Sequence, residues 1–258
     1  MKSIMMVMVF VLTFSLFIPN SLLLSGALNS TSQPNASTAE NLYNNHTMTL
    51  GNNIKNLIIL IPNEAHEPPS LPKELRVVNQ PYLPQNAVVN VGTTVVWFPT
   101  DIPHNHQVTV DDKNSRNLYD SGIIKFNTAS KPLNLNDTGT FLFHEATKNP
   151  KYPNFELNGT ITVVNQESPT NTNSSSGTNP DTIVTYMIPA NQLDKRISEF
   201  KGKGFEVDSS YSFKSLRGGG SEAGGDTQEY LVVLTSSGKS IDEVTSALKE
   251  ITATMPYT

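Results

Sequence analysis

The strongest structural signal in this chain is Val91-Gly92-Thr93-Thr94-Val95-Val96-Trp97. The surrounding segment, Val88–Phe98, is rich in β-branched residues, and its glycine suits a turn or a bulge. Leu57–Ile61 is a short apolar run, which suits a strand buried on both faces. Short strands with turn residues between them predict a sandwich of two sheets, with Trp97 in the core.

Further segments follow this strand in order. They are Asp101-Ile102-Pro103-His104-Asn105-His106-Gln107-Val108-Thr109-Val110, Tyr119-Asp120-Ser121-Gly122, Gly139-Thr140-Phe141-Leu142-Phe143-His144-Glu145 and Asn158-Gly159-Thr160-Ile161-Thr162-Val163-Val164. Together these pieces resemble the cupredoxins, the plastocyanin and azurin family of small copper proteins, and most of all the archaeal secreted cupredoxins. The resemblance covers roughly residues 54–165. It implies a Greek-key β-sandwich that binds copper and transfers electrons.

The copper-ligand loop departs from the family pattern. The family follows its Gly-Thr-Phe strand with a Cys-x-x-His-Pro-x-Met loop, whereas this chain contains no cysteine. Glu145 falls where the resemblance places the cysteine, and Lys148-Asn149-Pro150 falls near the loop histidine. A blue-copper centre requires a thiolate, so we do not expect fast blue-copper electron transfer.

Two histidines precede the strand that begins near Val108. His106 holds the position that the resemblance assigns to the first copper-ligating histidine, and His104 shares its face because the two are two residues apart. On the later strand, Glu145 shares a face with Phe143 and points toward this histidine pair. His144 lies on the opposite face and points away, unless the strand ends before it.

The candidate metal ligands are therefore His104, His106, Glu145 and His144. Imidazole and carboxylate ligands suit non-blue Cu(II) or Zn(II) rather than Cu(I). His66, with Glu64 and Glu67, could add a ligand if its proline-rich loop folds over the site. The alternative is that the domain binds no metal and that the histidines are only polar surface residues.

The amino-terminus reads as an export signal. Lys2 precedes a nearly unbroken apolar run, Ile4–Ile18, and Ser25-Gly26-Ala27 supplies small residues for cleavage. Residues 1–27 are predicted to be a signal peptide or, if uncleaved, a membrane anchor, and in either case the remainder is extracellular or at the cell surface. The net charge of −5 and the absence of a basic run argue against a nucleic-acid partner.

The rest of the chain divides by composition. Residues 28–53 and 166–180 are rich in Asn, Ser and Thr, and are predicted to be a disordered spacer and a linker. Residues 181–258 predict a small α+β domain of β-α-β-β-α order, in which Ser240 and Glu243 form a helix capping box.

The glycine-rich segment 216–225 lacks the ending of a phosphate loop and suits a hairpin connection. Sequons for N-glycosylation begin at Asn29, Asn35, Asn45, Asn136, Asn158 and Asn173.

The fold class expected is mainly β, a cupredoxin-like sandwich at 54–165 followed by the α+β domain at 181–258. No enzyme signature is present, so we do not expect an enzyme; a metal-dependent enzyme has only an open imidazole and carboxylate site in its favour. The function expected is an exported cupredoxin-like protein that holds copper, or zinc, through a non-blue His/Glu site. The alternative is a metal-free module at the cell surface that contacts a protein partner.

Overall fold

A computed structural model describes residues 37–62, 82–100, 104–148, 150, 154, 156–165, 181–215 and 227–254. The predicted signal segment, the His66 loop, the 166–180 linker and the glycine-rich segment lie outside these residues. Within the described residues, no helix is long and apolar enough to cross a membrane.

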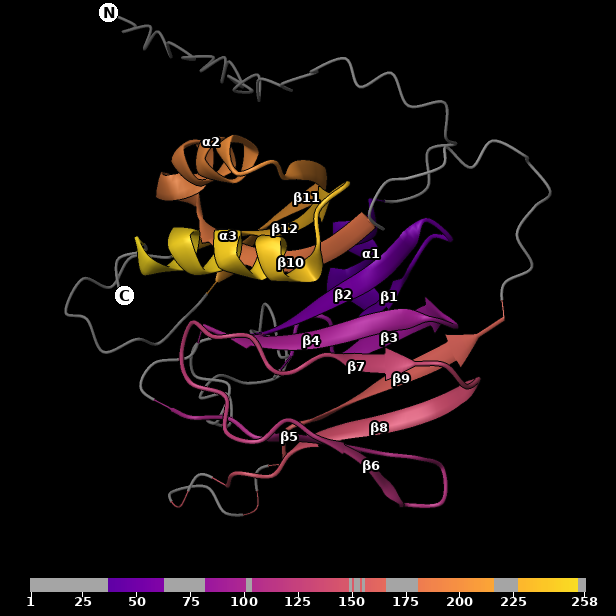
Figure 1. Cartoon of the computed structure of the whole chain (residues 1–258). Coiled ribbons are helices and arrows are strands. Elements are labelled where there is room, and N and C mark those ends of the chain that lie inside the picture. The colour runs from indigo at the N-terminus through magenta and orange to yellow at the C-terminus, as the bar shows by residue number, and fades with distance from the viewer. Residues whose placement is uncertain are drawn as a thin grey trace, which may run out of the picture. The chain divides into compact units, whose positions relative to one another are not determined.

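Two six-stranded sheets form the body of the protein (Figure 1). The first sheet has the order β1 (Thr47–Thr49), β3 (Asn86–Asn90), β9 (Asn158–Val164), β8 (Gly139–Glu145), β5 (Val108–Asp111) and β6 (Asn117–Asp120). The second has the order β11 (Glu206–Ser215), β12 (Thr227–Ser236), β10 (Asp181–Pro189), β2 (Ile54–Ile61), β4 (Thr93–Pro99) and β7 (Leu133–Leu135). The helices are α1 (Thr38–Asn45), α2 (Leu193–Gly202) and α3 (Ile241–Ala253), with a 3-10 turn, η2 (Ala190–Gln192), before α2. The chain is mainly β, as predicted.

The core between the sheets is built around Trp97 of β4. Its ring is fully buried, stacks on Tyr119 at a centroid distance of 5.5 Å and meets Phe143 edge-on at 5.6 Å. Val95 and Phe141 are buried as well. The prediction of a β-sandwich with these side chains in its core is confirmed.

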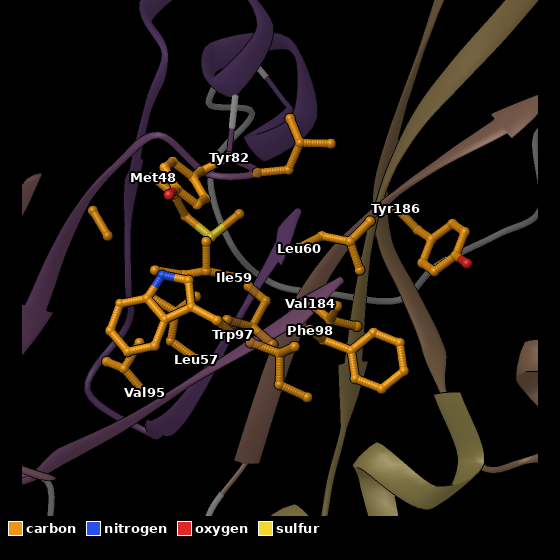
Figure 2. Packing of buried hydrophobic residues seen from close by; sticks show 14 of the residues in the cluster. Met48, Leu57, Ile59, Leu60, Tyr82, Val95, Trp97, Phe98, Val184 and Tyr186 are labelled. Carbon is orange, nitrogen blue, oxygen red and sulfur yellow. The ribbon is translucent and has the colours of Figure 1, made fainter. Parts of the chain in front are cut away.

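The second sheet is buried on both faces where β2 and β4 lie. Trp97 and Phe98 are neighbours in β4 and point to opposite sides of it (Figure 2). Tyr186 of β10, which lies on the same face as Phe98, meets Phe200 of α2 edge-on at 5.3 Å, and its hydroxyl lies 3.0 Å from Thr252 of α3. α2 and α3 therefore form a third layer over this face, which explains why Leu57–Ile61 of β2 is apolar on both sides.

The carboxyl-terminal region has the predicted β-α-β-β-α order, but its sheet is continuous with that of the sandwich. β10 pairs in parallel with β2, in a register that places Thr182 beside Asn56 and Val184 beside Ile58. The Asn56 side chain donates a hydrogen bond to the Thr182 hydroxyl at 3.1 Å. Asn35–Thr258 accordingly forms one compact unit.

Residues 37–53, part of the predicted disordered spacer, differ from that expectation because they form α1 and β1. Ser37 caps α1 by accepting a hydrogen bond from the Glu40 N–H at 3.1 Å. The helix packs on β11, where the Tyr43 ring stacks on Tyr211 at 4.8 Å. Polar composition alone predicts no core for this segment, and contacts with a distant part of the chain supply it.

Candidate functional site

His106 is held in place by its own backbone. Its N–H donates to the Ile124 carbonyl at 2.9 Å, and the Ile124 N–H donates back at 2.7 Å. This antiparallel bridge immediately precedes β5 and directs the imidazole into the sandwich, on the same face as Val108. The side chain is 0% exposed.

Glu145 is the last residue of β8 and lies opposite Val108 in the first sheet. Strand alternation turns its side chain inward with that of Phe143, and the carboxylate is only 2% exposed. Its Oε2 lies 2.9 Å from His106 Nδ1. Its Oε1 accepts the N–H groups of Gln107 at 2.6 Å and Thr147 at 3.2 Å. The two predicted site residues are therefore in direct contact.

The electrostatics of this pair follow from its burial. An ionised carboxylate only accepts hydrogen bonds, so the contact requires a proton on His106 Nδ1 that is donated to Glu145. The negative charge of Glu145 also reaches Tyr82, whose pKa is raised well above 10.0, chiefly by burial and further by this charge. Tyr82 meets Phe143 edge-on at 4.9 Å, and Phe143 shares the inward face of β8 with Glu145.

His144 lies outside this site. β8 continues through Glu145, so alternation directs His144 to the outer face of the sheet, where its ring is 40% exposed. Its Nε2 lies 2.8 Å from the hydroxyl of Thr109. His104 is half-buried, and nowhere in the described part of the chain do three His, Asp or Glu side chains gather as a metal-binding group.

These residues do not fit the copper centre that the family resemblance implies. The cysteine position carries Glu145, and both of its oxygens are already used by His106 and by backbone N–H groups. The pair is sealed from water, so no solvent ligand completes a coordination sphere there. Among the described residues, the arrangement is that of a buried hydrogen-bonded pair rather than of a metal centre.

One polar cluster was not anticipated from the sequence. Thr109, Asp111 and His144 come together on the outer face of the first sheet. Period-two alternation along the two strands was the available signal, because it places all three on the face opposite to His106 and Glu145.

No family model matches the chain, and a comparison with curated proteins finds no relative. Among solved structures, a novel purple cupredoxin from Nitrosopumilus maritimus is similar, with 22% identity over 42% of this chain and 99% of that one and a TM-score of 0.33. An amicyanin variant shares 17% identity over 43% of this chain and 83% of its own, with a TM-score of 0.28. The Cu-containing nitrite reductase from Thermus scotoductus SA-01 shares 13% over 48% of this chain and 29% of its own, with a TM-score of 0.35. The neighbours of this chain among solved structures are thus cupredoxins and cupredoxin-containing copper proteins.

Proposed function

We propose that this chain is an exported cupredoxin-like protein whose sandwich interior functions without a metal, as a non-enzymatic interaction module at the cell surface. The observation that carries the proposal is the direct 2.9 Å contact between His106 and Glu145 at the place where the resemblance puts copper ligands. Export is supported by the apolar run Ile4–Ile18 behind Lys2. The proposed partner is another protein, which the exported chain contacts outside the cell.

The competing function is copper or zinc holding through His104, His106 and Glu145. A metal at His106 Nδ1 would displace the proton there, and Glu145 Oε2, now 2.9 Å away, would have to move outward, since two ligand atoms on one ion lie roughly 3–4 Å apart. Gln107 and Thr147 hold Oε1 of the same carboxylate through their N–H groups and so oppose that movement. In the described part of the chain His104 does not join the pair in a group of three metal-binding side chains, so two ligands alone remain and we favour the metal-independent interpretation.

The test is metal retention by the purified exported chain. The protein is incubated with Cu(II) or Zn(II), desalted, and analysed for metal and for visible absorption. We expect well under one ion per chain and no intense charge-transfer band, since no thiolate is present. His144→Gln serves as the matched control, because it removes an imidazole from the opposite face of the same sheet. One retained ion per chain that His106→Gln abolishes and His144→Gln leaves in place would establish copper or zinc holding instead.

A further inference from the structure

The outer face of the first sheet carries a His–Asp pair on adjacent strands. β5 and β8 are paired so that Thr109 lies opposite His144 and Asp111 lies opposite Leu142, which makes His144 and Asp111 diagonal neighbours. His144 Nδ1 lies 3.7 Å from Asp111 Oδ2, and the two side chains are 40% and 22% exposed. The pair is thus fixed by the sheet and open to solvent.

Thr109 contacts Nε2, the ring nitrogen of His144 that does not face Asp111. The Thr109 hydroxyl lies within 3.5 Å of the His144 carbonyl, to which it can only donate. When the hydroxyl donates to that carbonyl, its oxygen accepts from His144 Nε2–H, at 2.8 Å. In the neutral imidazole this leaves a lone pair on Nδ1, facing a carboxylate oxygen at a distance too long for a hydrogen bond. In this tautomer, His144 Nδ1 and Asp111 Oδ2 both present lone pairs, 3.7 Å apart.

We propose that His144 Nδ1 and Asp111 Oδ2 bind an exchangeable divalent transition-metal ion, Zn(II) or Cu(II), on this outer face. Two ligand atoms with metal bonds of about 2.0–2.2 Å lie roughly 3–4 Å apart on one ion, which matches the observed 3.7 Å. An imidazole nitrogen and a carboxylate oxygen are a suitable ligand pair for both ions. Because the pair is partly exposed, water completes the coordination, unlike at the sealed His106–Glu145 pair.

Both ligands have the supporting contacts that metal-binding side chains require. The Thr109 hydroxyl contacts the non-ligating nitrogen of His144 at 2.8 Å and can accept its proton when Nδ1 binds the ion. The Asn117 side chain donates to the other oxygen of Asp111 at 3.5 Å, which leaves Oδ2 directed at His144. With only two protein ligands the ion exchanges with solvent, so the site is distinct from any tightly retained interior metal.

The test is a titration of the full chain with Zn(II) alone, followed by calorimetry and by the NMR signals of the histidine rings. We expect one saturable site, with the largest shifts on His144. His144→Gln and Asp111→Asn should each weaken binding at least tenfold, and Thr109→Val by about tenfold, as for losses of supporting contacts. Thr109→Ser, which keeps the hydroxyl, should restore binding.

Asp120→Asn is the matched control, since Asp120 is a neighbouring carboxylate already bonded through both oxygens to the Gln107 side chain. It should leave Zn(II) binding unchanged. The inference is overturned if no saturable site is found, if His144→Gln has no effect, or if Asp120→Asn weakens binding as much as Asp111→Asn. Because this ion is removed by desalting, the outcome is independent of the retention experiment on His106.

Discussion

At the scale of single residues, Glu145 is the substitution with the largest consequence. A carboxylate at the position where the resemblance places cysteine meets His106 and two backbone N–H groups, so the end of the sandwich is closed by hydrogen bonds. A buried pair of this kind is not by itself a source of stability, since desolvation offsets the attraction. Its importance is that neither residue tolerates loss of the other.

We therefore predict strong coupling between His106 and Glu145. His106→Gln and Glu145→Gln should each lower the free energy of unfolding by about 3–5 kcal/mol, because each leaves a buried group uncompensated. The double variant should lose clearly less than the sum, with an interaction energy of about 1–3 kcal/mol. Urea unfolding of the four proteins measures the cycle. The exposed pair Lys203–Glu250 is the control and should show no comparable coupling. If the losses of unfolding free energy from His106→Gln and Glu145→Gln simply add in the double variant, the prediction is wrong.

Trp97 tests the core. Trp97→Ala should reduce the free energy of unfolding by about 3–5 kcal/mol, because it removes a fully buried ring that packs on Tyr119 and Phe143. Leu142→Ala, at a 45% exposed position of the same sandwich, should cost far less. Chemical denaturation checks both. A loss below about 1 kcal/mol for Trp97→Ala would mean that the ring does not organise the core.

At the scale of elements, β9 runs close to its neighbours only because Gly159 has no side chain. A Cβ at this position would lie 2.2 Å from the Gln85 carbonyl oxygen and 2.3 Å from a Phe143 ring carbon. Neither the backbone of the adjoining segment nor a ring enclosed by Tyr82 and Trp97 has room to retreat. Close packing thus dictates the residue type within this strand.

Gly159→Ala should therefore destabilise the protein by about 1–3 kcal/mol through overpacking. Gly202→Ala is the matched substitution, since a Cβ there meets nothing within 4 Å and the residue ends α2. It should be neutral or stabilising by up to about 1 kcal/mol. Thermal or urea unfolding separates the two, and equal effects would show that the contacts of β9 are looser than the structure describes.

The capping box of α3 gives a prediction with a pH dependence. The Glu243 carboxylate accepts from the Ser240 N–H and hydroxyl, which lowers the pKa of Glu243 below 4.5. The ionised Glu243 carboxylate therefore contributes fully to the free energy of unfolding above pH 4.5. This contribution is lost as the pH falls through the lower pKa of Glu243 in the folded state. Ser240→Ala should cost about 0.5–2 kcal/mol near neutrality and less in acid. Ser246→Ala is the control, since Ser246 is exposed inside α3, and it should leave the free energy of unfolding unchanged. A destabilisation by Ser240→Ala that does not vary with pH would contradict this account.

At the scale of the whole molecule, the regions 54–165 and 181–258 share one sheet and one helical layer. The parallel pairing of β10 with β2 is reinforced by the Asn56–Thr182 hydrogen bond and by the Asn53 side chain, which donates to Asp181 at 2.8 Å. α1 adds a further link, since the Ala39 N–H donates to the Ser209 hydroxyl, 170 positions along the chain, at 2.9 Å. Separating the two regions would expose β2 along one edge and uncover its helix-facing side.

A protease site inserted in the 166–180 linker tests this arrangement. After cleavage, we expect the two pieces to stay together in gel filtration and to unfold in one transition, because the β10–β2 pairing survives the cut. The two-domain interpretation of the composition predicts that each piece folds by itself. Pieces that elute separately, each with a cooperative transition of its own, would support that interpretation over the shared sheet.

Local pattern determined much of this protein from its sequence alone. The apolar run Leu57–Ile61 predicts a strand buried on both faces, the Ser240–Glu243 spacing predicts a capping box, and alternation predicts that Glu145 points inward while His144 points outward. All of these depend on neighbours within one element, where backbone periodicity fixes direction.

Only the tertiary structure decided which distant elements meet. The parallel pairing of β10 with β2 and the packing of α1 on β11 join segments whose local patterns carry no mark of their partners. Stability of such contacts comes from burial and pairing across the fold rather than from propensity, which is why the polar residues of α1 read as a spacer. The Thr109–His144–Asp111 cluster could not be predicted from the sequence for the same reason, because its geometry depends on the register between β5 and β8.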